Sequence, residues 1–465
     1  MPLFVEYIRQ FGRFQRNARL YLISNALSGV TLGIITVLYN LYLIALGYNT
    51  AFVGLVLFVG TIGAGAAIFP AGFCIDRLGG KAILIWASVL IGIAGAGQML
   101  FRSSVPLLVS CFIVGIGGAF ILVVNAPYLA LNSTEQERPH VFSLNIVVTL
   151  VTTVIGEMFG GVLPLWFRHI PWLMATLPSW CSWCLASSLQ ARSYQLALLL
   201  AGVIAVPSFL PLFLLSDDRP QWGTQRTRER HPVLSPLQRW QQFRLRFFSV
   251  LCERSLWRWL LSPLSILTLI QVCIGFGAGL FLPYFNIYFV QHLGASPALF
   301  GFLDALANTL NAISTLLAPW LMLRYGKMFT MIVPRLLSLP LMLLIGLTSY
   351  LPLAAFLYPL RQGLMDMSQG ILQVFSMEAI PLKSRGIANS SYQAAYQVAW
   401  AISASVSGFI IVHAGYAPIF IIAAIFYLIA IGLLWIRFGH GNTIDVQAEE
   451  CAGSSGAEGS EVAHT

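Results

Sequence analysis

Residues 51–81 read AFVGLVLFVGTIGAGAAIFPAGFCIDRLGGK, an uncharged stretch that ends in a cluster of charges. No Asp, Glu, Lys or Arg occurs in residues 51–75, whereas Asp76, Arg77 and Lys81 follow within a few positions. A helix needs about 20 apolar residues to cross the hydrocarbon core of a bilayer. The stretch therefore predicts a membrane-spanning helix that ends in a short charged turn.

The rest of the chain repeats this pattern, and its composition is that of a membrane protein. Of 465 residues, 58% are hydrophobic and 9% are charged, with a mean hydropathy of +0.79, whereas soluble proteins have about 25% charged residues. Unpaired backbone groups find no water in lipid, which favours helices. We predict an all-α integral membrane protein with twelve spans, near residues 20–46, 51–75, 82–101, 106–131, 141–166, 194–215, 263–291, 297–322, 328–349, 352–380, 387–412 and 416–437.

The basic residues predict the orientation of these spans. With the N-terminus inside, 21 of the 26 Lys and Arg fall on the inner side, and only Arg102, Arg168 and Arg192 fall outside. An excess of Lys and Arg in cytoplasmic loops sets the topology of membrane proteins. We therefore expect a multi-pass protein of the plasma (inner) membrane with both termini in the cytoplasm. The net charge of +9 is then an orientation signal and no sign of nucleic-acid binding.

The hydrophobic pattern divides the chain into five parts. We predict a cytoplasmic N-terminal segment at 1–19, a six-helix bundle at 20–215, a basic cytoplasmic linker at 216–262, a second six-helix bundle at 263–437 and a disordered cytoplasmic tail at 438–465. The linker contains nine Arg and no Lys. Residues 236–259 interleave Arg with Leu, Phe and Trp, which suits a helix on an anionic inner leaflet or a solvated linker.

The two halves of the membrane region repeat each other in one register. A shift of 247 residues pairs Gly54 with Gly301, Gly79 with Gly326, Arg77 with Arg324 and Gly161 with Gly408, and a shift of 246 pairs Gly29 with Gly275, Gly33 with Gly279 and Asn40 with Asn286. Two parallel six-helix repeats are a known transporter plan, with the solute site near the bilayer midplane between them. We therefore expect two pseudo-symmetric bundles.

The turn after the second span contains a motif. Gly72, Asp76, Arg77, Gly79 and Lys81 match the pattern G-x-x-x-D-R-x-G-x-[RK], and this segment resembles the loop motif of the major facilitator superfamily. The resemblance covers residues 20–437 and implies a carrier that works by alternating access. It also implies that the acid and the bases of this loop latch the two bundles on the cytoplasmic side. Plain topology-determining charge is the alternative.

The second half has a weaker copy of this motif. Arg324 and Gly326 are kept, but Leu323 stands where the acid is expected. In the fifth span, Gly156-Glu157-Met-Phe-Gly160-Gly161 is similar to the G-P-x-x-G-G end of an antiporter motif of the same superfamily, with Glu157 in place of Pro. These small residues also suit close helix packing.

Five charged residues lie deep inside the predicted spans, Glu157, Asp304, Arg335, Arg361 and Asp366, and Glu378 lies near an inner end. Each costs at least about 2.5 kcal/mol at the centre of a helix in a bilayer, so each requires a polar environment. Two of them belong to stripes at helical spacing. The stripes are Asp304, Asn308, Asn311 and Thr315 in the eighth span, and Gln362, Asp366, Gln369, Gln373 and Ser376 in the tenth. Such stripes line a water-filled cavity or pack on another helix.

Glu157, Asp304 and Arg361 lie at one depth, ~10–14 Å below the outer surface at 1.5 Å per residue. Two acids beside one Arg cannot both ionise cheaply, so we expect a proton-coupling site, with a static buried salt bridge as the alternative. Asp366 is expected to contact a polar or cationic solute. Arg335 is expected to reach the inner surface or to pair with Glu378.

These observations predict a secondary active transporter that exports an organic or amphipathic solute in exchange for protons. Proton-coupled uptake of a metabolite is the alternative, and a membrane-embedded enzyme or receptor is a more distant one. No nucleotide-binding loop occurs, which argues against a primary pump. We expect a monomer that acts on a small-molecule substrate, without enzyme activity, cofactor or metal. Cys181 and Cys184 form a C-x-x-C, which we assign to an aromatic outer loop rather than to a disulfide or a metal site.

Overall fold

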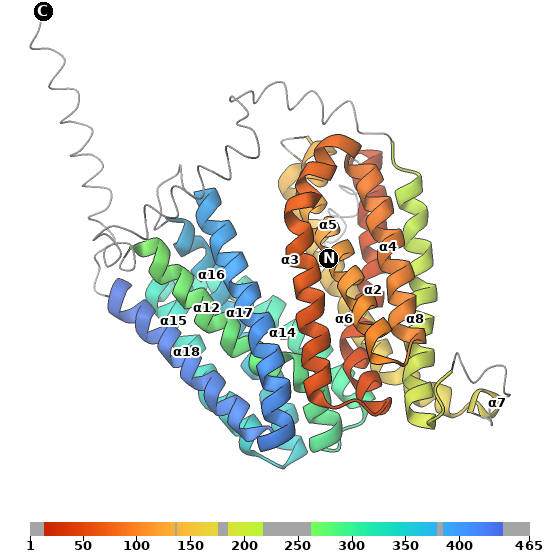
Figure 1. Cartoon of the computed structure of the whole chain (residues 1–465). Helices are drawn as coiled ribbons and strands as arrows, with labels where there is room; N and C mark the ends of the chain where they lie inside the picture. Colours follow the sequence, from red (N-terminus) through yellow and green to blue (C-terminus); the bar gives the residue numbers. More distant parts are fainter. Residues whose placement is uncertain (1–13, 135–136, 175–184, 217–261, 379–384, 440–465) are drawn as a thin grey trace, which may run out of the picture.

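A computed structural model describes residues 14–134, 137–174, 185–216, 262–378 and 385–439 (Figure 1). Most of the predicted linker and tail, the first thirteen residues, and Cys181 and Cys184 lie outside these ranges. The long helices of the first half are α2 (Arg16–Ala45), α3 (Thr50–Leu78), α4 (Gly80–Leu100), α5 (Ser104–Leu131), α6 (Arg138–Arg168) and α8 (Leu189–Phe213), and a short helix α7 (Pro171–Met174) precedes α8.

The second half begins with a broken span. It runs from α12 (Pro263–Phe281) through the 3₁₀ turn η1 (Leu282–Tyr284) and α13 (Phe285–Ile287) into the π-helical turn η2 (Tyr288–His292). Pro283 lies at the break, as expected of a residue that lacks a backbone N–H and clashes with the preceding turn. The remaining helices are α14 (Pro297–Tyr325), α15 (Lys327–Leu347), α16 (Leu351–Glu378), α17 (Arg385–Ala414) and α18 (Ala417–Phe438).

These helices confirm the predicted all-α membrane fold, and their ends fall within a few residues of the predicted spans. Within the described ranges, eleven spans are long and apolar enough to cross a membrane by composition alone. The twelfth is α16, which has sufficient length but contains Arg361, Asp366 and several Gln. It packs between α14 and α15, and its Arg361 is only 1% exposed, so protein encloses this charge instead of lipid.

The two halves pack in the same way, as the sequence repeat predicts. In the first half α2 lies along α6, and in the second half α12 lies along α17. Gly33 allows α2 to approach α6 closely, because a Cβ there would lie 2.7 Å from the Glu157 backbone nitrogen. Its repeat partner Gly279 allows α12 to approach α17 in the same way, because a Cβ there would lie 3.0 Å from the Trp400 carbonyl carbon. Small residues let membrane helices approach closely, which explains why the register is kept.

Two glycines of the loop motif have a conformational role. Gly79 joins α3 to α4 with a φ of +83°, and Gly326 joins α14 to α15 with a φ of +89°. Side chains other than glycine rarely adopt this left-handed region. The pairing of these two positions in the sequence repeat therefore reflects two equivalent sharp turns between helices.

The two bundles contact each other through α3 with α17 and through α6 with α14. We call the side of the α2–α3 turn (residues 46–49) the outer side and the side of the α3–α4 turn the inner side. Figure 1 shows the bundles close together towards the outer side and diverging towards the inner side. Hydrogen bonds between the bundles agree with this view, because Thr50 donates to the Gly408 carbonyl and Ser405 to the Gly54 carbonyl, both at 3.0 Å. The structure is thus closed on the outer side.

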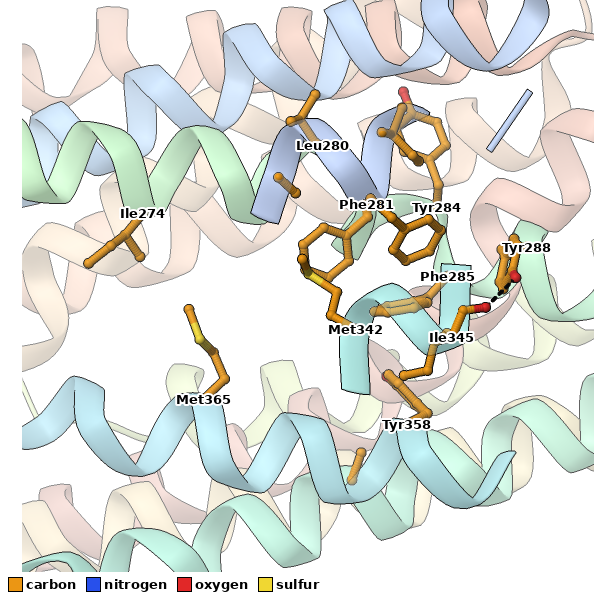
Figure 2. Packing of buried hydrophobic residues seen from close by; sticks show 14 of the residues in the cluster. Ile274, Leu280, Phe281, Tyr284, Phe285, Tyr288, Met342, Ile345, Tyr358 and Met365 are labelled. Atoms are coloured by element: carbon orange, nitrogen blue, oxygen red, sulfur yellow. Dashed lines mark hydrogen bonds between the residues drawn. The ribbon is translucent and has the colours of Figure 1, made fainter. Parts of the chain in front are cut away.

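Aromatic side chains fill the core of the second bundle near the broken span (Figure 2). Phe281 and Phe285 lie edge to face with ring centroids 5.2 Å apart, and Phe285 packs on Tyr358 of α16 at 4.7 Å. Tyr288 donates to the Ile345 carbonyl of α15 at 2.6 Å, the dashed line in Figure 2. This packing fixes the irregular backbone of the broken span, which is tolerated in a membrane only where protein surrounds it.

Candidate functional site

The two predicted acids lie on either side of the contact between the bundles. Glu157 of α6 accepts a hydrogen bond from the Asn308 amide of α14, with 2.7 Å between Oε1 and Nδ2. Asp304, one turn from Asn308 on α14, accepts a hydrogen bond of 2.6 Å from the Tyr358 hydroxyl of α16. Glu157 is only 1% exposed, and its Oε2 has no hydrogen-bond partner among the described residues. The site is therefore a pair of neighbouring acids, Glu157 buried and Asp304 half-buried, held by neutral donors.

Glycines bring these two helices close enough for the contact. A Cβ on Gly161 of α6 would lie 2.8 Å from the Ala298 Cα of α14, and a Cβ on Gly301 of α14 would lie 3.0 Å from the Gly161 Cα. Gly301 precedes Asp304 and Asn308 by about one and two turns of the same helix. The spacing of small and polar residues on α14 thus places its polar stripe against α6 next to Glu157.

A second polar cluster lies within the C-terminal bundle. Arg361 of α16 donates to the Gln362 side-chain oxygen at 2.8 Å, and the Gln362 amide donates to Asp366 at 2.6 Å. Arg335 of α15 donates to the Gln369 side-chain oxygen at 2.9 Å. Both arginines are 1% exposed, and the Nε of each is buried without a partner among the described residues. The cluster therefore retains unused hydrogen-bond donors.

The structure groups the predicted residues differently from the expected arrangement of two acids around one arginine. The Arg361 guanidinium lies over the Phe281 ring, 4.6 Å from its centroid, and bonds to Gln362 instead of to Glu157 or Asp304. Arg335 does not extend to the inner surface, because it is fully enclosed and bonds to Gln369. The side chain of Glu378, its other expected partner, lies outside the described residues.

The remaining members of the two stripes lie towards the inner side. Asn311 accepts a hydrogen bond of 3.3 Å from Thr315, and Gln373 is exposed. Three His, Cys, Asp or Glu side chains that could hold a metal ion do not come together anywhere in the described ranges. The polar groups offered by this site are therefore carboxylates, amides and guanidiniums, which suit proton transfer and solute binding.

The loop motif has a local role in the first bundle. Lys81 donates to the Leu215 carbonyl near the end of α8 at 2.5 Å, whereas Arg77 is exposed and Gly72 has open space around it. The Asp76 side chain is not among the described ones. In the second bundle, Arg324 lies over the Trp320 ring at 5.5 Å. The predicted latch joins the two bundles on the inner side, where they are apart in this structure. It therefore stays a prediction about the conformation that is closed on the inner side.

Sequence reasoning missed two features of the site. Tyr358 is the direct partner of Asp304, and it continues the stripe of Gln362 and Asp366 by one further turn at i−4 and i−8. Asn40 donates to the Pro283 carbonyl at 2.7 Å, and Asn286 donates to the Val37 carbonyl at 3.1 Å, so that the repeat-related pair bridges the bundles in both directions. The repeat itself was the signal that could have identified this pair.

Comparisons with known proteins agree with this architecture. The family model of the Major Facilitator Superfamily matches residues 21–357 and 267–450. Among solved structures, a bacterial homologue of the human lysosomal transporter Spinster in an inward-facing and occupied conformation superimposes with a TM-score of 0.68 at 14% identity, over 90% of this chain and 96% of that chain. No curated protein sequence matches the chain.

Two further structures are similar to this chain. A D-xylose–proton symporter aligns with a TM-score of 0.63 at 16% identity, over 90% of this chain and 97% of that chain. The xylose transporter XylE from E. coli, in an inward open conformation, aligns with a TM-score of 0.63 at 15% identity, over 91% of this chain and 97% of that chain. At these identities the likeness shows the fold alone. The family match extends over both bundles, and the chain therefore belongs to the major facilitator superfamily and is a membrane transporter, not an enzyme.

Proposed function

We propose that this transporter is a proton-coupled exporter of an organic or amphipathic solute that works by alternating access as a monomer. The observation that carries the proposal is the hydrogen bond between Glu157 and Asn308 across the two bundles, with Asp304 one turn away. A carboxylic acid placed at a contact that must open and close can link proton binding to the movement of the bundles.

The physical link is the charge on Glu157. To open the outer side, α6 and α14 must separate, which breaks the bond to Asn308 and exposes Glu157 to water. Closing the contact over an ionised carboxylate with one unpaired oxygen costs several kcal/mol more than closing it over a neutral acid. The proton on this side chain therefore biases the conformational equilibrium, which is the requirement for coupling.

The placement of the antiporter-like segment supports exchange. Gly156 and Gly160 pack on Val30 and Ile34 of α2, and Gly161 packs on α14 across the bundle boundary. Glu157 stands within this segment, at the point where the first bundle contacts the second. A proton released or taken up here therefore acts directly on the contact that moves.

We infer that the outer side faces away from the cytoplasm, as the basic residues predict, and cysteine labelling checks this. In a variant without the seven native cysteines, Ser187→Cys on the outer side should react with an impermeant maleimide in intact cells. Leu78→Cys at the inner end of α3 should react only after the cells are permeabilised. Both positions are exposed, so access depends on the side of the membrane. The reverse pattern would overturn the orientation.

A pH measurement in sealed proteoliposomes tests the coupling and its mode. With an acidic lumen that contains a pH-sensitive dye, external solutes are added from a panel of organic anions, organic cations, sugars and nucleosides. Proton exchange predicts that the transported solute enters while the lumen becomes more alkaline, faster than in protein-free liposomes. Further acidification of the lumen would indicate symport and hence uptake. Solute exchange without any pH change would refute proton coupling.

A further inference from the structure

We propose that the solute is an organic anion and that its carboxylate or phosphate group binds to Arg335 and Arg361 in the C-terminal bundle. The inference rests on the proposed function only in requiring a solute site. It names the chemical class of the solute, and it replaces the expectation that Asp366 contacts a cationic solute.

Unused donor capacity is the first observation. Arg335 and Arg361 lie on the adjacent helices α15 and α16, and each is 1% exposed. Each guanidinium has five N–H donors, yet their described hydrogen-bond partners are few and uncharged: Gln369 for Arg335, and Gln362 and Tyr427 for Arg361. Both Nε atoms are buried without a partner there. Buried donors without acceptors are costly, so an incoming acceptor is favoured.

The balance of charge is the second observation. Asp366 is the described acid that lies beside both arginines, and it is held by the Gln362 amide at 2.6 Å. Among the described side chains it forms no ion pair with either guanidinium within 4.0 Å. Tyr396 and Tyr427 lie nearby, and the Tyr427 hydroxyl shares a hydrogen bond with Arg361, but a phenol supplies no full negative charge to balance a guanidinium. Two cations beside one acid leave an excess positive charge in a low-dielectric interior, which attracts anions and repels cations.

The surroundings favour an anion with an apolar body. The Arg361 guanidinium lies over the Phe281 ring at 4.6 Å, and Phe281 continues through Phe285 to Tyr358 in a contiguous buried aromatic cluster (Figure 2). Met365 of α16 adds a polarizable thioether to the same core. The planar guanidinium binds carboxylate and phosphate oxygens in pairs. An aromatic carboxylate therefore matches the cluster better than a sugar or an inorganic ion.

The test uses three probes of one skeleton: phenylbutyrate, phenylbutanol and phenylbutylamine. Thermal unfolding of the purified full-length protein in detergent reports binding as a concentration-dependent rise in Tm. Phenylbutyrate should raise the Tm, and the alcohol and the amine should not. Arg335→Gln and Arg361→Gln should each weaken the apparent affinity at least about tenfold, the loss expected for one charged hydrogen bond. Asp366→Asn should strengthen it several-fold, because it removes a competing negative charge.

The controls separate binding from folding. Arg168→Gln removes an exposed arginine at the outer end of α6 and should keep the affinity of the unaltered protein. If either Gln variant fails to fold, Arg335→Lys and Arg361→Lys retain the charge and should show an intermediate affinity. Stabilisation by the amine, loss of binding in Asp366→Asn, or no response to phenylbutyrate would each overturn the proposal. No proton gradient is present in detergent, so failure of this test is distinct from failure of proton coupling.

Discussion

Glu157→Gln is expected to abolish gradient-driven solute accumulation and to leave exchange of internal for external solute largely intact. Gln keeps the size of the side chain and an oxygen that can accept from Asn308, 2.7 Å away in the native contact. It cannot bind or release a proton, so the charge that links closure of the outer side to the proton gradient is lost. Exchange needs the solute site but no net proton movement. The measurement is accumulation and exchange of one labelled solute in the same proteoliposomes.

Glu137→Gln is the matched control, because it is the same substitution on the same helix. Glu137 lies at the N-cap of α6 on the inner side, where it accepts from the Thr134 hydroxyl at 2.9 Å, and its loss should leave accumulation unchanged. Asp304→Asn should behave like Glu157→Gln, since the amide oxygen can still accept from Tyr358. Full pH-driven accumulation in both acid variants would mean that these carboxylates are structural. Asp366 would then be the next candidate for the coupling residue.

Gly161→Val is expected to hinder closure of the outer side and thereby to slow transport. A Cβ at this position would lie 2.7 Å from the Pro297 carbonyl oxygen and 2.8 Å from the Ala298 Cα, which are backbone atoms of α14 that cannot rotate away. Overpacking of this kind costs about 1–3 kcal/mol. The conformational equilibrium should therefore shift towards the outward-facing state on the order of tenfold or more.

A cysteine at the other contact between the bundles, that of α3 with α17, reports this shift. Ser405→Cys on α17 lies against Gly54 of α3 and is shielded while the outer side is closed. An impermeant thiol reagent should label it faster in the Gly161→Val background. Gly118→Val in α5 adds the same side chain where no atom lies within 4 Å, so labelling and transport should stay unchanged. Equal labelling in both glycine variants would contradict a role for Gly161 in closure.

Much of the fold could be predicted from the sequence because local physics determines it. A run of about 20 apolar residues has no stable alternative to a helix in lipid, so each span is found within a few residues of its predicted ends. The sequence repeat pairs Gly33 with Gly279, which predicts equivalent helix contacts in the two halves. Two helix backbones approach closely only where no Cβ lies between them. The charges inside the spans indicated which helices have polar faces, because a charged side chain is costly to place in lipid.

The candidate site could be predicted only in part. Helical periodicity placed Asp304 and Asn308 on one face of α14, but it does not state which neighbour that face meets. The pairing of Asp304 with Tyr358, and the separation of Arg361 from the acid pair, depend on how three helices are rotated about their axes. Depth in the membrane was the same for all three predicted residues, and depth alone does not distinguish neighbours from residues on opposite faces.

By itself the sequence determined the membrane class, the twelve helices, the two equivalent halves and the family, because these follow from hydropathy, small-residue spacing and one charged turn. Only the tertiary structure decided which polar groups meet, that Glu157 contacts Asn308 across the bundles, and that Arg335 and Arg361 retain unpaired donors. It also decided which side is closed. The physical reason is that an alternating-access carrier has two packings of one sequence that differ by a few kcal/mol. Local propensities are the same in both, and only the contacts between the bundles distinguish them.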